Sequence, residues 1–293
     1  MSIYKTSKAK ASLAEITERF LAKLPSKGKG HTVSTSFGDT YCLELGDPSL
    51  PKLVVFHGGY TNHAFILYYL RSLIGQFHIF AFDMPGHPGK SSETVIDPRD
   101  NSYGVWACEA IEAVGLTRAT LLGLSYGGFV SQRVAALKPK LVENLVLIVP
   151  AGVCGMNQLS LIRHLMLPQL LFGLTHRDSF LMAMMDALFT DYDDELVVDF
   201  FRDMLLYVKN DSRQMRLSDA KEFESFEQPV LLMTAENDVV FDFKKQAQQA
   251  KNLFKNLTVF ELKGSKHSPS VTESKRNEVC NHIKDFILRA DKG

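Results

Sequence analysis

Short apolar runs of strand length recur along the chain, with helix-like segments between most of them. The apolar runs are residues 52–57, 77–83, 119–124, 144–150, 229–235 and 257–263, and the helix-like segments lie near residues 64–74, 102–115, 127–138, 242–254 and 272–290. Continuous apolar strands that alternate with helices are typical of a mostly parallel sheet covered on both faces. Because parallel crossovers are right-handed, the pattern predicts a doubly wound α/β fold.

The first part of the chain departs from this alternation. Apolar residues recur at helical spacing over residues 11–24, which predicts an amphipathic leader helix. The stretch 25–31 contains glycines and lysines and predicts a flexible connector. Residues 31–46 then alternate in polarity around Gly38 and Asp39, which predicts a β-hairpin that turns at these two residues.

The interval between Pro150 and Pro229 contains no convincing strand. It is rich in Leu, Met and Phe, and predicts helices separated by Pro168, by Gly173 and by the acidic stretch 190–195. We interpret this interval as a helical lid inserted over the sheet. The predicted parts are a first core part at 1–150, with the leader helix and connector at 1–31, a lid at 151–228 and a second core part at 229–293.

The composition argues against several classes of protein. Lys and Arg together number 33, as do Asp and Glu, so the formal net charge is zero and gives no reason to expect nucleic acid or an anionic membrane as a partner. No apolar stretch approaches the roughly 20 residues of a membrane-spanning helix. The first ten residues are polar and no signal-peptide core follows them. The four cysteines are too far apart for a metal motif, so we expect no metal site and a cytoplasmic protein with reduced thiols.

The segment 121–130, LLGLSYGGFV, places a single serine between glycines where a strand would turn into a helix. Ligands of open α/β sheets bind at the carboxyl ends of the strands, where Ser125 would lie. A tight turn there would strain the serine backbone, and side chains at Gly123 and Gly127 would clash. The following helix directs its positive N-terminus at the site. The pattern Gly-x-Ser-x-Gly therefore predicts that Ser125 is a nucleophile.

A serine nucleophile needs a base, and the base needs an acid that orients it. In this arrangement the acid and then the histidine follow the serine, on loops after later strands. Asp238 comes directly after one predicted strand, and His267 follows the next. Asp242 is nearer to the helix that follows and is the better candidate for its N-cap. We therefore predict a Ser125–Asp238–His267 triad.

Backbone N–H groups should stabilise the negative charge that develops on the substrate oxygen. One donor would be Tyr126, the residue after the nucleophile. The other would come from the loop HGGYTN after an early strand, where we assign Gly59, with Tyr60 as the alternative. His57 ends a strand ahead of the nucleophile and is predicted to brace this loop.

These segments together resemble the successive landmarks of the α/β-hydrolase superfamily. They are HGG, FDMPGHPGKSS, GLSYGG, AENDVV and GSKHSP, within a match that runs from about residue 33 to the end of the chain. The resemblance implies an eight-stranded sheet that begins antiparallel, a lid after the sixth strand and the same triad. Within the superfamily the chain is similar to the serine-nucleophile, carboxylesterase-like branch. One departure is Pro88, inserted in the segment after Asp83, which leaves the shape of that loop open.

The resemblance implies a serine hydrolase that cleaves carboxylic esters or thioesters through an acyl-enzyme, without a metal or an organic cofactor. The lid is rich in apolar side chains and positive charge is sparse near the site, which predicts a small-molecule substrate with a neutral, small to medium apolar acyl group. Carbon–carbon bond hydrolases, peptidases and acyltransferases can use the same residues. A non-catalytic ligand-binding protein of this fold is a further alternative.

Overall fold

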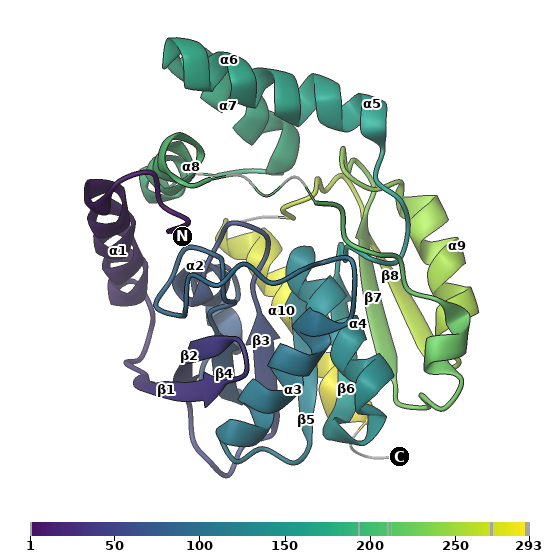
Figure 1. Ribbon diagram of the computed structural model, residues 1–293. Coiled ribbons are helices and arrows are strands. Elements are labelled where there is room, and N and C mark those ends of the chain that lie inside the picture. The colour runs from purple at the N-terminus through teal and green to yellow at the C-terminus, as the bar shows by residue number, and fades with distance from the viewer. Residues whose placement is uncertain (1, 193, 210, 212, 270–271, 291–293) are drawn as a thin grey trace.

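An eight-stranded sheet forms the centre of the molecule (Figure 1). The computed structural model describes residues 2–192, 194–209, 211, 213–269 and 272–290. The strands are β1 (Lys29–Thr35), β2 (Gly38–Leu45), β3 (Lys52–Phe56), β4 (His78–Phe82), β5 (Ala119–Leu124), β6 (Val142–Ile148), β7 (Val230–Ala235) and β8 (Leu257–Leu262). They lie in the order β1-β2-β4-β3-β5-β6-β7-β8. The pairs β1–β2 and β2–β4 are antiparallel and the other neighbours are parallel, so the predicted fold class is confirmed.

Helices cover both faces of the sheet and lie over its carboxyl edge (Figure 1). The helices outside the β6–β7 connection are α1 (Ser7–Ala22), α2 (His63–Tyr69), α3 (Ser102–Ala113), α4 (Tyr126–Leu137), α9 (Phe243–Leu253) and α10 (Glu273–Ala290), with short turns η1 (Arg71–Leu73) and η2 (Pro139–Leu141). Between β6 and β7 come α5 (Gln158–Leu161), η3 (Ile162–Met166), α6 (Leu167–Thr175), α7 (Asp178–Leu188), α8 (Glu195–Tyr207) and η4 (Ala220–Phe223). The layer of α5, α6 and α7 lies furthest from the sheet in this view.

Alternate side chains of the central strands enter two separate hydrophobic cores. In β3, Leu53 and Val55 pack in the core that contains α2 and α10, whereas Val54 and Phe56 pack in the core that contains α3 and α4. All four side chains are essentially inaccessible to water. A strand that is buried on both faces has no polar side, which explains the continuous apolar runs in the sequence.

The predicted β-hairpin is present, but its turn lies earlier than predicted. Strand β1 pairs with β2 as far as Thr35 opposite Gly38, so Ser36 and Phe37 form the turn. Gly38 is the first residue of β2 and has a φ of +99°, which glycine adopts without strain. The predicted turn lies two residues too late in the sequence, because a positive φ next to a turn selects glycine just as the turn itself does.

Two of the predicted helix breaks in the insertion are wrong. The elements α5, η3 and α6 form one helical run through Pro168, which lies in the first turn of α6 directly after the π-helical η3. The wide π turn alters the hydrogen-bond pattern just where a proline has no N–H to donate. Gly173 lies inside α6, and this run ends at His176, whose φ is +54°. The acidic stretch that begins at Thr190 starts after α7, and its last residue, Glu195, is the first residue of α8, so this predicted break is present.

Helix α1 begins before the predicted residue 11 and joins the core to the insertion. It starts at Ser7 because the Thr6 hydroxyl accepts the N–H of Ala9 at 3.1 Å, an N-cap. The wholly buried Phe20 packs against Phe65 of α2 and Phe200 of α8, with ring centroids 5.7 Å apart in both pairs.

Candidate active site

Ser125 lies on a sharp turn between the end of β5 and the start of α4. Its φ of +50° and ψ of −108° are strained for a residue with a side chain. A Cβ at Gly123 would lie 2.2 Å from the carbonyl oxygen of Gly127, and a Cβ at Gly127 would lie 2.1 Å from that of Phe56. The N–H of Ser125 donates to the carbonyl oxygen of Ile148 at 2.9 Å, which fixes the turn to β6. Both glycines are therefore needed to bring the serine to this position.

Gly127→Ala is expected to destabilise the protein by about 3 kcal/mol, at the upper end of the usual cost of overpacking, because the obstacle is backbone and cannot rotate away. Urea unfolding followed by circular dichroism measures the change. Gly155→Ala is the matched control, since a Cβ there meets nothing within 4 Å. Equal unfolding midpoints for the two variants would contradict the tight packing of this turn.

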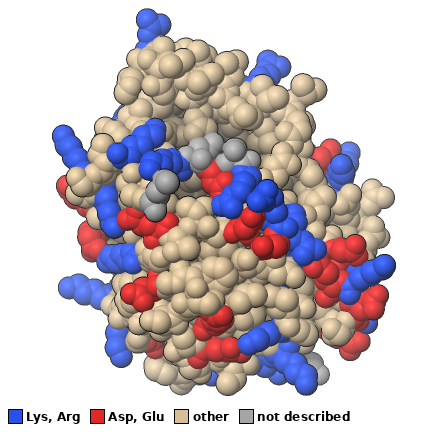
Figure 2. All heavy atoms as spheres, viewed as in Figure 1, with Lys and Arg blue, Asp and Glu red and all other residues tan. Residues whose placement is uncertain are grey.

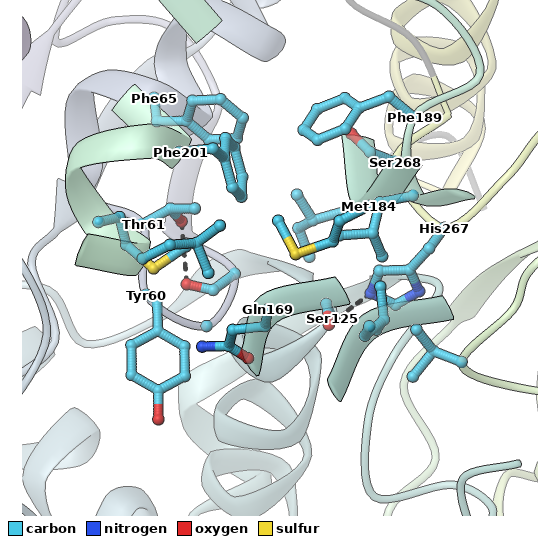
Figure 3. A pocket seen from close by; sticks show the side chains of 18 of the residues that line it. Tyr60, Thr61, Phe65, Ser125, Gln169, Met184, Phe189, Phe201, His267 and Ser268 are labelled. Carbon is cyan, nitrogen blue, oxygen red and sulfur yellow. Dashed lines mark hydrogen bonds between the residues drawn. The ribbon is translucent and has the colours of Figure 1, made fainter. Parts of the chain in front are cut away.

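His267 and Asp238 follow β8 and β7, and both reach the carboxyl edge of the sheet. His267 Nε2 lies 2.9 Å from Ser125 Oγ, and His267 Nδ1 lies 2.9 Å from Asp238 Oδ2 (Figure 3 shows the first of these bonds). The Asp238 side chain is 2% exposed and that of His267 15%. Because a carboxylate only accepts, Nδ1 carries the proton and Nε2 can accept the serine proton. The structure thus brings the three predicted residues together in the geometry that activates a serine.

The two candidate acids have different surroundings. Asp238 Oδ1 accepts the N–H groups of Val240 at 2.7 Å and Phe241 at 3.3 Å, which fixes the carboxylate on the turn after β7. Asp242 accepts the N–H of Lys245 at 2.9 Å and is the N-cap of α9. The geometry therefore gives Asp238 the contact to the histidine and Asp242 the capping position.

The predicted oxyanion donors lie on the loop after β3 and at the start of α4, beside Ser125. Gly59 lines the same pocket as Ser125, and a Cβ at Gly59 would lie 3.6 Å from Cδ2 of Tyr126. Tyr126 is the first residue of α4, and the N–H of a first helical residue has no acceptor within its own helix. Tyr60, the alternative donor, has a φ of +57°, and its hydroxyl accepts the N–H of Asp211 at 2.5 Å. The site of oxyanion binding itself remains a prediction.

His57 ties the Gly58–Gly59 loop to the loop after β4. Its Nδ1 donates to the carbonyl oxygen of Gly58 at 2.8 Å, and its Nε2 accepts the N–H of Met84 at 3.0 Å. Burial lowers the pKa of His57 to about 3, so the ring is neutral at pH 7. These contacts agree with the bracing role predicted for His57 and leave it no contact with Ser125.

The sequence did not anticipate a second buried histidine behind the same loops. His87 packs against Tyr126, with ring centroids 5.1 Å apart, and against Tyr60 at 6.0 Å. Burial lowers the pKa of His87 to about 4, which makes it a neutral packing group at pH 7. His87 lies between Gly86 and Pro88, residues typical of exposed turns, so the sequence did not indicate that its side chain is buried.

The loop that contains Pro88 closes around the buried Asp83 carboxylate. Asp83 Oδ1 accepts the N–H of His63 at 2.8 Å, and Oδ2 accepts the N–H of Lys90 at 2.7 Å. A Cβ at Gly89 would lie 2.5 Å from the carboxyl carbon, so the backbone wraps the carboxylate closely. The inserted proline is therefore accommodated in a loop whose two sides Asp83 holds together.

An apolar pocket of about 250 Å³ opens beside Ser125 (Figure 3). Its wall includes Phe65, Met184, Phe189, Phe201, Met204 and Val240. The polar side chains Gln169 and Ser268 also line it, and Ser268 Oγ is buried with no hydrogen-bond partner among the described residues. The sequence predicted an apolar wall from the insertion but did not single out Phe65, because Phe65 lies in the continuous apolar run AFILYY, residues 64–69, of α2.

Among the described residues, no group of three or more His, Cys, Asp and Glu side chains could hold a metal ion. The four cysteines are free and buried.

A mostly parallel sheet with a serine on the turn after β5, and a histidine and an acid after later strands, defines an α/β hydrolase. The chain belongs to the α/β hydrolase family, since the model of that family matches residues 53–281. Carboxylesterase YbfK of Bacillus subtilis is 29% identical over 134 residues, which cover 46% of this chain and 45% of the relative. The chain therefore spans about half the length of this curated relative in the alignment.

Solved structures of similar proteins match almost the whole fold. The crystal structure of carboxylesterase CesB (YbfK) from Bacillus subtilis superposes with a TM-score of 0.80 at 19% identity, over 96% of this chain and 99% of that one. Naproxen esterase from Bacillus subtilis has a TM-score of 0.82 at 17% identity, with the same coverage. At such identities the likeness shows the fold.

Proposed function

We propose that this chain hydrolyses carboxylic esters or thioesters of small to medium apolar acyl groups, through an acyl-enzyme on Ser125. The observation that carries the proposal is the hydrogen-bonded Ser125–His267–Asp238 arrangement at the edge of an apolar pocket. The similarity to carboxylesterase YbfK supports the same reaction.

In the first half of the proposed reaction, Ser125 Oγ attacks the substrate carbonyl carbon while His267 Nε2 takes the serine proton. The N–H groups of Gly59 and Tyr126 hold the oxyanion of the tetrahedral intermediate. His267 then gives its proton to the leaving alcohol or thiol, and the acyl group stays on Ser125. Asp238 keeps the proton on Nδ1 and stabilises the imidazolium that forms.

In the second half, His267 takes a proton from water as the water oxygen attacks the acyl-enzyme. The acid product leaves when His267 returns the proton to Ser125 Oγ. Every group in these steps belongs to the chain, the ester or water, so the proposed mechanism requires no cofactor. The insertion at 151–228 acts as the lid that shields the acyl-enzyme and forms the pocket wall.

The acyl group is proposed to be neutral because the pocket wall is apolar and carries no Lys or Arg. Side chains of phenylalanine and methionine line it, and methionine adapts to apolar groups of different shape. The substrate is therefore a small-molecule ester. The cytoplasmic location inferred from the cysteines stays a prediction.

The value of kcat/KM for p-nitrophenyl esters is expected to rise from acetate to about butyrate or hexanoate and then to fall. Each methylene that enters the pocket favours binding by about 0.8 kcal/mol until the pocket is full. Met204→Ala enlarges the pocket and should move the optimum to longer esters. Met166→Ala is the matched control, since Met166 is 58% exposed and does not line the pocket.

Ser125→Ala serves as the blank in these assays, so that background hydrolysis of activated esters is subtracted. A preference for charged acyl groups, or activity on peptides alone, would contradict the proposed substrate class. A serine-directed fluorophosphonate probe separates enzyme from binding protein, because it should label the wild type and not Ser125→Ala. An unlabelled wild-type protein would favour the non-catalytic alternative.

A further inference from the structure

The outermost helical run of the insertion exposes a continuous row of large apolar side chains. We call this row the lid stripe: Leu159, Ile162, Met166, Leu167, Leu170 and Leu174, which are 49–82% exposed. Apart from the adjacent Met166 and Leu167, they recur every three or four residues along α5, η3 and α6, which places them along one side of the run. In Figure 1 this run lies at the top of the molecule, with no ribbon above it.

The opposite side of the same run is also apolar and is already covered. Phe172 is 1% exposed, Leu165 packs on the hydrophobic core, and both Leu165 and Gln169 line the pocket. A helix that is apolar on its outer side as well as its inner side normally buries both. The lid stripe is therefore a helix face for which the described part of the chain supplies no cover.

Clustered apolar exposure of this kind marks an interaction surface, whereas single exposed leucines are ordinary. Elsewhere on the described surface, exposed large apolar residues are scattered, such as Leu137 on α4 and Leu288 on α10. The lid stripe, by contrast, has six exposed large apolar residues within only 16 residues of chain, from Leu159 to Leu174.

Charge around the stripe indicates what covers it. Residues 158–177 contain no Asp or Glu, while Arg163 and Arg177 are exposed. The nearest acid along the chain, Asp178, lies 3.4 Å from Arg202 and is partly neutralised by it. Figure 2 shows an expanse of neutral residues at the top of the molecule, with Lys or Arg and no Asp or Glu there. The chain as a whole is neutral, but this segment is locally basic.

We propose that the lid stripe docks on an anionic lipid surface, with α5 to α6 lying in the plane of the interface. Aliphatic side chains would enter the acyl region, and the long stems of Arg163 and Arg177 would let their guanidinium groups reach lipid phosphates. In the described part of the chain no helix is long and apolar enough to span a bilayer, so this contact is with one face of it.

Two other occupants fit the stripe less well. A second copy of the chain, packed face to face, would offer Arg163 and Arg177 no acidic partner on the facing run. Protein interfaces are enriched in aromatic residues as well as Met and Arg, whereas residues 158–177 contain no Tyr or Trp and their one Phe, Phe172, is buried, so the exposed face is mainly aliphatic. The lipid contact goes beyond ester hydrolysis and is independent of it, although the run that docks also forms part of the pocket wall.

Flotation with vesicles tests the proposal. The wild type is expected to float with vesicles of phosphatidylcholine and phosphatidylglycerol, and to bind those of phosphatidylcholine alone more weakly. The variant Leu159→Gln/Met166→Gln/Leu174→Gln should lose at least about tenfold in vesicle binding, because its polar side chains stay in water. Arg163→Gln/Arg177→Gln should lower binding to the anionic vesicles about fivefold or more and reduce its salt dependence.

The matched control is Leu137→Gln/Leu217→Gln/Leu288→Gln, which removes three exposed leucines away from α5 to α6 and should float like the wild type. Thermal melts and turnover of p-nitrophenyl butyrate check that each variant is folded, since none of these residues lines the pocket. A wild type that does not float, or a stripe variant that floats equally well, overturns the proposal. A wild-type dimer that fails to float, and that the stripe variant dissociates, would assign the surface to a second copy.

Discussion

Ser125→Ala and His267→Ala are each expected to lower kcat by about 10⁴–10⁶, and the double variant should fall little further. The two residues act in one proton transfer, across the 2.9 Å between Ser125 Oγ and His267 Nε2, so removing either removes that step. Turnover that remains reflects the oxyanion donors and substrate binding alone. Stopped assays with p-nitrophenyl butyrate, at enzyme concentrations high enough to detect residual turnover, measure the loss.

Folding is the control for this result, because Ser125 has a positive φ in a strained turn. The thermal melt of Ser125→Ala should stay close to that of the wild type, since alanine keeps the Cβ and the backbone hydrogen bond to Ile148. Near wild-type turnover in Ser125→Ala would remove Ser125 from the proposed mechanism. Additive losses in the double variant would show that the two residues do not act as a unit.

Asp238→Asn is expected to lower kcat by about 10⁴. An asparagine that keeps the bonds from Val240 and Phe241 on its oxygen presents its NH₂ group to His267 Nδ1, and Nδ1 must then accept. The proton moves to Nε2, which can no longer take one from Ser125. The same esterase assay measures the effect, and KM should change far less than kcat.

Asp242→Asn is the matched acid-to-amide control, four residues along the chain. It should keep most activity and lose much less stability than the about 0.5–2 kcal/mol of a lost N-cap, because an asparagine oxygen can still accept the N–H of Lys245 at the start of α9. The reverse pattern, with activity lost in Asp242→Asn and kept in Asp238→Asn, would transfer the role of the acid to Asp242.

Local sequence predicted those features that depend on backbone shape and chain order. The strands were recognisable because their side chains are buried on both faces, and the turn at Ser125 because Gly123 and Gly127 leave no room for a Cβ. Ser125 and His267 are 142 residues apart, yet parallel strands end at one edge, so their position after strands was enough to expect them together.

Features that depend on tertiary packing were not predictable in this way. Phe65 and Phe201 line the pocket, but nothing in their sequence neighbours separates a pocket phenylalanine from a core phenylalanine. Pro168 was expected to separate two helices, but the π turn that precedes it accommodates the proline within one helical run. Such a turn has no sequence signal, so the continuation was not predictable. The charge total of the chain likewise concealed a segment of 20 residues, 158–177, without an acid.

Helix α1 has a consequence for any redesign of this protein. It is held to α8 by Phe20 and by the hydrogen bond from the Ser12 hydroxyl to Asp203, and to the N-cap of α2 by the bond from Asn62 to Thr17 at 2.9 Å. The part of the pocket wall that α8 contributes, Phe201, Met204 and Leu205, is thereby held against α1 and α2. To admit bulkier acyl groups, Phe201 and Met204 should be replaced by smaller residues one at a time. Larger changes, such as exchange of a lid segment, are better made in α5 to α6 than in α8, which α1 holds in place.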